Sequence, residues 1–68
     1  MPKVVMNNLR KIRHELEIDT QQEMAVFLGV KQQQYSRYEN NVVQPSLAVA
    51  LEIAKKLNRP IESIFRLI

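Results

Sequence analysis

The chain has 68 residues, of which 46% are apolar and 25% charged, and it contains no cysteine. That length fits one small domain, residues 1–68, whose core has to form without disulfides. The net charge of +3 is mild and agrees with a polyanionic partner, but basicity alone does not establish one.

The composition also argues against several classes of protein. One histidine, no cysteine and a single glycine leave no metal-ligand set, no nucleophile pair and no glycine-rich phosphate loop. We therefore expect neither an enzyme nor a cofactor, metal or small-molecule substrate. The sequence contains no secretory signal and no apolar run near 18 residues, so we expect a cytoplasmic protein without membrane contact.

The N-terminal part begins with a β-prone run, Val4-Val5-Met6, followed by a helix. Asn7 or Asn8 can cap this helix, and its apolar stripe is predicted at Leu9, Ile12 and Leu16. Arg10, Lys11 and His14 lie off that stripe, and we expect them to be plain exposed residues.

The second predicted helix begins at Thr20, which forms a capping box with Glu23. Met24, Ala25, Phe27 and Leu28 follow at helical spacing. Gly29, the only glycine, comes directly after them, where a left-handed residue would end the helix. A helix, a tight turn containing glycine and a second helix make a helix-turn-helix unit.

The third predicted helix opens at Lys31 and has two different faces. Tyr35 and Tyr38 share one face and are expected to pack inward. The opposite face has side chains that hydrogen-bond to base edges, since Gln pairs with adenine and Arg with guanine. The alternative is that this face is only solvated. The position of the helix directly after the turn favours base reading instead. Its members are Gln32, Gln33, Ser36 and Arg37.

Residues 8–65 resemble the Cro/repressor type of helix-turn-helix, also called the XRE family. The matching segments are T-Q-x-E-M-A-x-x-L-G-V from Thr20, x-Q-Q-x-Y-S-R-Y-E-N ending at Asn40, and Gln44-Pro45-Ser46-Leu47. The resemblance implies a lambda-repressor-like, all-α bundle of five helices whose third helix enters the major groove. The chain differs from the family pattern at two places. It has Asn41 where the family usually has glycine, and its loop at residues 17–19 lacks the glycine that the family often has there.

The resemblance also assigns roles to individual positions. The base readers are Gln32, Gln33 and Arg37, with Ser36 on the same face, and the phosphate contacts are Gln21, Lys31 and Asn40. It further implies that Arg13 pairs with Glu39 through a two-pronged bond that joins the first helix to the third. The alternative for Arg13 is a solvent-facing side chain.

In the C-terminal part, Ser46 is expected to cap a fourth helix and Asn58 to end it. Val49 and Ile53 lie beside this helix's stripe, as extra core or as a dimer seam, and Val42-Val43 either tuck under the domain or contact a partner. We predict a last helix from Pro60 and a small antiparallel β pair between the two termini. The inward stripe of the fourth helix is predicted at Leu47, Ala50, Leu51, Ala54 and Leu57.

Two functional hypotheses follow from the sequence. The first is a sequence-specific regulator of double-stranded DNA, acting as a repressor and as a homodimer, because one helix reads too few base pairs for selectivity. The alternative is an antitoxin or anti-regulator that binds a protein partner through its apolar termini, with the helix-turn-helix as inherited scaffold.

Overall fold

The structure is a computed structural model and describes residues 4–68. The predicted domain, residues 1–68, therefore extends three residues outside the described part. The described chain contains two short strands, four α-helices and one turn of 3-10 helix. In chain order they are β1 (Val5–Asn7), α1 (Leu9–Glu15), α2 (Gln21–Leu28), α3 (Gln32–Glu39), α4 (Leu47–Leu57), η1 (Ile61–Ser63) and β2 (Phe65–Leu67).

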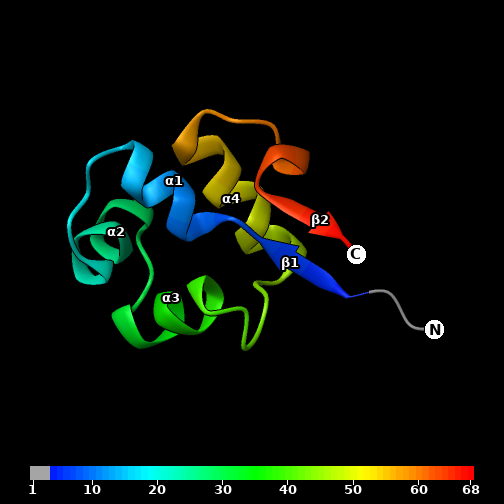
Figure 1. Ribbon diagram of the computed structural model, residues 1–68, viewed down its shortest axis with the longest axis horizontal. Helices are drawn as coiled ribbons and strands as arrows, with labels where there is room; N and C mark the ends of the chain where they lie inside the picture. The colour runs from blue at the N-terminus through cyan, green and yellow to red at the C-terminus, as the bar shows by residue number, and fades with distance from the viewer. Residues whose placement is uncertain (1–3) are drawn as a thin grey trace.

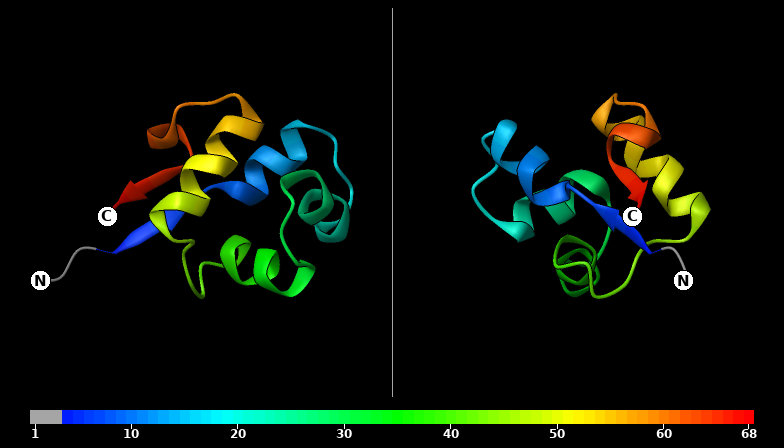
Figure 2. Two further views of the ribbon diagram at one scale, coloured as in Figure 1. Left: turned by 180° about the vertical axis from the view of Figure 1, so that it is seen from behind. Right: turned by 45° about the vertical axis from the view of Figure 1, so that its right-hand side comes forward.

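The helices pack around one core, and the strands lie at the opposite end of the molecule from α2 (Figures 1 and 2). β1 and β2 form an antiparallel pair in which Val5 faces Leu67 and Asn7 faces Phe65. The β pair predicted from the two terminal runs is thus confirmed. This pair joins the two ends of the described chain. Next to it, the Asn8 N–H donates to the Ile64 carbonyl at 3.1 Å.

The predicted fifth helix is only a single turn. Pro60 precedes η1, as its fixed φ favours, but helical geometry ends after three residues. Phe65 already belongs to β2, so the segment after Pro60 has no length for a full α-helix. The fold is therefore mostly helical with a two-stranded sheet.

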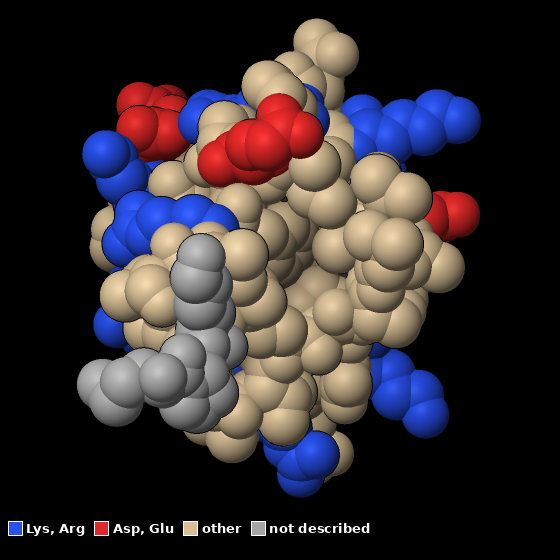
Figure 3. All heavy atoms as spheres, turned by 90° about the vertical axis from the view of Figure 1, so that its right-hand side faces the viewer, with Lys and Arg blue, Asp and Glu red and all other residues tan. Residues whose placement is uncertain are grey.

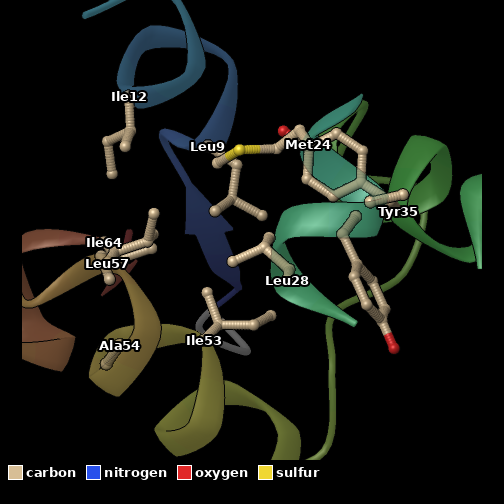
Figure 4. Close-up of a cluster of buried hydrophobic side chains, with 11 residues drawn as sticks. Leu9, Ile12, Met24, Leu28, Tyr35, Ile53, Ala54, Leu57 and Ile64 are labelled. Atoms are coloured by element: carbon tan, nitrogen blue, oxygen red, sulfur yellow. The ribbon is translucent and has the colours of Figure 1, made fainter. Parts of the chain in front are cut away.

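The core is formed by side chains from all four α-helices and from Ile64 (Figure 4). Leu9 and Met24 are fully buried, and Figure 4 shows them converging with Leu28 and Ile53 at the centre of the cluster. Tyr35 is also fully buried, and Tyr38 is 5% exposed. The inward orientation predicted for both tyrosines is confirmed.

Three apolar residues that were predicted to face inward are exposed instead, and Phe27 of the apolar run in α2 is exposed too. Leu16 lies in the turn after α1, because that helix ends at Glu15. Phe27 is 48% exposed at the edge of α2. On α4 the buried face is rotated toward Ile53, which leaves Leu47 72% and Leu51 51% exposed. Ile53 was predicted to be either extra core or part of a dimer seam, and it belongs to the core.

The predicted helix ends are confirmed by their hydrogen bonds and dihedral angles. The Thr20 hydroxyl accepts the Glu23 N–H at 3.1 Å, and Ser46 accepts the Val49 N–H at 3.3 Å. Gly29 ends α2 at φ 74°, and Asn58 ends α4 at φ 55°. Asn41, the second residue after α3, has φ 58°, so asparagine performs the left-handed role for which glycine is the commoner residue.

The phenol of Tyr35 leads to a prediction about alkaline pH. Its hydroxyl is buried and has no hydrogen-bond partner within residues 4–68. Burial raises the pKa of Tyr35 above its ordinary value of 10.0; the Glu39 carboxylate acts in the same direction, and the Arg13 guanidinium opposes it. The unfolded chain therefore ionises this phenol first, and its contribution to stability is lost as the pH rises above about 10.

We expect Tyr35→Phe to leave the free energy of unfolding at pH 7 unchanged, or to raise it by up to about 1 kcal/mol, since no bond is lost. Above pH about 10.5 the wild type should lose roughly 1.4 kcal/mol more per pH unit than the variant. Urea unfolding at several pH values measures both quantities. Parallel pH profiles for the two proteins would contradict this account of Tyr35.

Candidate nucleic-acid interface

The turn between α2 and α3 is held by backbone hydrogen bonds and by a lysine of α4. The Gly29 N–H donates to the Val26 carbonyl, and the Val30 N–H donates to the Ala25 carbonyl at 3.0 Å. Lys56 of α4 donates to the Leu28 carbonyl at 2.8 Å, so a cation lies at the negative end of α2. These contacts fix the direction in which α3 leaves the turn.

α3 has the two different faces that the sequence predicts. The two tyrosines lie in the core, whereas Gln32, Gln33 and Arg37 are exposed and Ser36 is half-buried. Gln34 is exposed as well, but its amide donates to the Tyr38 hydroxyl at 3.0 Å.

The exposed face of α3 and the start of α2 form one shallow hollow of about 400 Å³. The structure thus brings together all four proposed base readers and one proposed phosphate contact. Lys31, exposed at the position just before α3, and Asn40, exposed just after it, lie outside the lining. The lining residues are Gln21, Gln32, Gln33, Ser36 and Arg37.

Behind this hollow, the buried carboxylate of Glu39 joins three helices. Arg13 of α1 donates from Nε to Glu39 Oε1 at 2.9 Å, and Gln21 of α2 donates its amide N–H to Oε2. Only one prong of the two-pronged contact expected for Arg13 is formed, and its Nη1 donates to the carbonyls of Ile18 and Asp19, both at 3.0 Å. Arg13 thereby holds the loop after α1 as well as α3.

The partner of Gln21 limits its proposed contact with phosphate. One N–H of its amide is used by Glu39, so only the other N–H is available to an anion. Its backbone N–H, at the start of α2, offers a further donor.

Arg10 is a member of this interface that the sequence analysis did not identify. Its Nη2 donates to the Asn40 Oδ1, and its Nε lies 3.7 Å from Glu39 Oε1. A lone arginine on the exposed side of a helix carries no sequence signal for such a contact, since the partner is 30 residues away.

A second unidentified feature is a cluster of three amides, Asn7, Asn41 and Gln44, which we call the amide cluster. Asn7 is buried, and its Nδ2 donates at 2.8 Å both to the Tyr38 carbonyl and to Gln44 Oε1. Its backbone N–H donates to Asn41 Oδ1 at 2.9 Å, and its Oδ1 accepts the Leu9 N–H at 3.1 Å. The cluster therefore fastens β1 and the start of α1 to the C-terminal end of α3.

Neither a metal site nor a membrane span is found in the described part of the chain. No group of three or more His, Cys, Asp or Glu side chains within residues 4–68 is placed to hold a metal ion. No helix in the same range has the length and apolar character needed to cross a bilayer.

Comparison with known families agrees with this geometry. A family model described as helix-turn-helix matches residues 9–64, which is most of the chain. The chain belongs to this family, the XRE or Cro/repressor type that its motifs resemble. No curated protein sequence matches it.

Ten chains of solved structures match the chain. One is a crystal structure of a protein from Bacteroides fragilis that was provisionally named a DNA-binding protein. It has a TM-score of 0.77 and 24% sequence identity, over 93% of this chain and all of that one. At this identity the likeness shows the shared fold.

The amide cluster predicts different roles for two neighbouring asparagines. Asn7→Ala should lower the free energy of unfolding by about 2 kcal/mol, because the Tyr38 carbonyl loses one of its two donors, Gln44 Oε1 loses the Asn7 donor and the Leu9 N–H loses its acceptor. Asn8→Ala is the matched control, since Asn8 Oδ1 has no partner within residues 4–68, and should change it by less than about 0.5 kcal/mol. Urea unfolding measures both, and equal effects would contradict the assignment.

Proposed function

We propose that the chain is a sequence-specific, double-stranded DNA-binding transcriptional regulator that acts as a repressor. One observation carries the proposal: α3 buries its two tyrosines and turns Gln32, Gln33, Ser36 and Arg37 toward a shared open hollow. A helix can enter the major groove of DNA, and the amide and guanidinium groups on this face match the edges of adenine and guanine. The provisional name of the Bacteroides fragilis relative supports the same partner.

Base reading and phosphate binding are divided between positions in this proposal. Gln32, Gln33, Ser36 and Arg37 read bases, whereas Gln21, Lys31 and Asn40 contact phosphates on either side. A bound regulator occupies the groove and blocks competing proteins there, which is how a small domain can repress. A DNA partner agrees with the cytoplasmic location that we expect from the sequence.

We further propose that the regulator is a homodimer, because two half-sites are needed for selectivity. Exposed apolar side chains support a protein–protein contact: Leu47 and Leu51 on α4, and Leu67 and Ile68 at the C-terminus are each more than half exposed. Figures 1 and 2 show the first turn of α4 beside the strands. Among residues 4–68, the Lys, Arg, Asp and Glu side chains seen on the face turned toward the viewer in Figure 3 surround its centre, where only other residues are seen.

A second copy of the chain suits that face. β1 and β2 form a sheet of only two strands, so each has an outer edge without a strand partner in residues 4–68. A lone two-stranded sheet with exposed edges and apolar side chains gains stability by packing on another surface. The same exposed residues favour the alternative function, an antitoxin or anti-regulator that binds a different protein.

The proposed base readers should differ from the proposed phosphate contacts in their effect on sequence choice. Gln33→Ala or Arg37→Ala should cost about 1–3 kcal/mol at the affected base pair and relax the preference there. Lys31→Ala should weaken binding to all sequences about equally. Selection from random duplexes, followed by binding titrations on single-base variants, measures both effects, and uniform losses for all three variants would refute base reading.

The dimer proposal is tested by adding a charge at an exposed apolar residue of α4. Leu51→Glu should convert a dimer into a monomer in sedimentation at tens of micromolar protein, because a buried unpaired carboxylate is strongly unfavourable. Val26→Glu is the control, since Val26 is 74% exposed but lies on α2 at the other end of the molecule. A wild type that sediments as a monomer at this concentration would rule the dimer out.

A further inference from the structure

The exposed arginine of α1, Arg10, reaches across to the end of the recognition helix. Its side chain is 57% exposed, yet its Nη2 donates to Asn40 Oδ1, just after the last residue of α3. Its Nε lies 3.7 Å from the Glu39 carboxylate, which already has a direct ion pair with Arg13. Arg10 is therefore not needed to neutralise Glu39, and most of its guanidinium remains open to solvent.

This contact sets the orientation of the Asn40 amide. Because Oδ1 accepts from Arg10, the Nδ2 group, which only donates, is turned away from Arg10. Within residues 4–68 its partner is the Ser36 hydroxyl at 3.4 Å, a long contact that leaves the second N–H available. A phosphate group accepts hydrogen bonds and donates none, so this orientation suits a phosphate.

The charges around Arg10 favour the same kind of ligand. The outer side of α1 borders a broad hollow of about 670 Å³, whose lining includes Arg10, Lys11 and His14. Two carboxylates also border it, Glu15 and Glu39. Glu39 has an ion pair with Arg13, and Glu15 accepts a hydrogen bond from Arg59 at 3.0 Å, so Arg10 and Lys11 are the excess positive charges there.

We propose that Arg10 and Asn40 together bind one DNA backbone phosphate, which makes α1 a third DNA-contacting element beside α2 and α3. Asn40 follows Ser36 by one helical turn, so this phosphate lies beyond the bases that α3 reads. Arg10 supplies charge and two or more N–H donors, and it also holds the Asn40 amide with its donors outward. The inference rests on the proposed function, because it requires DNA on the α3 face.

The test compares Arg10→Met with Lys55→Met in the full chain. Both variants remove one positive charge, but Lys55 lies exposed on α4 and makes none of the contacts described here. Affinity is measured between 50 and 200 mM salt for a duplex selected by the wild type and for a scrambled duplex of equal length. Circular dichroism confirms that both variants are folded.

For Arg10→Met we expect the negative slope of log K against log salt to become shallower by about 0.9 on both duplexes. The ratio of the two affinities should stay unchanged. Lys55→Met should keep the wild-type slope. An Arg10→Met protein with wild-type affinity and slope would overturn the inference while leaving the proposed function intact. A wild type without salt-sensitive DNA binding would refute the proposed function itself.

The orienting role of Arg10 is tested separately by a double-mutant cycle. If Arg10 holds the Asn40 amide, the Arg10→Met/Asn40→Ala protein should lose less affinity than the product of the two single losses. Losses that multiply independently would show that the two residues do not act on one phosphate.

Discussion

The burial of Tyr35 and Tyr38 fixes the rotation of α3 about its own axis, and the remaining features of the interface follow from that. Two aromatic side chains three residues apart occupy one face of an eight-residue helix, so the opposite face must point outward. The residues on that outer face are two glutamines, a serine and an arginine. A rotation of α3 by one residue would expose an aromatic ring and bury a guanidinium, which is costly in both respects.

Rotation alone does not set the position of α3, and polar contacts supply the rest. At its C-terminal end, Glu39 joins α3 to α1 through Arg13 and to α2 through Gln21. The amide cluster then holds the Tyr38 carbonyl against β1. Because Asn7 also belongs to the β pair, the strands at the proposed dimer face are connected to the end of α3 by direct hydrogen bonds.

The parts of this structure that could be predicted from sequence are those governed by local rules. The caps at Thr20 and Ser46, the left-handed Gly29 and the inward tyrosines each depend on residues within one or two helical turns. The rotation of α4 could not be predicted in the same way. Apolar residues cover more than half of its circumference, so periodicity fits several rotations, and the choice of Ile53 over Leu51 depends on packing against other helices.

Contacts between residues far apart in the sequence could not be predicted either. Asn7 was considered only as a helix cap, although its partners in the amide cluster lie more than 30 residues away. Arg10 was treated as a solvated residue for the same reason. The final helix was overestimated because the apolar residues after Pro60 fit a helix and a strand equally well, and pairing with β1 decides for the strand.

The central claim, that the outer face of α3 meets the bases, is tested most directly by the side-chain amide signals of the glutamines in an NMR titration with a selected DNA duplex. The account predicts large shifts for the Gln32 and Gln33 amides, while Gln34, which is bonded to Tyr38, stays nearly unchanged. Shifts confined to the strands and α4, with the α3 glutamines unaffected, would contradict it.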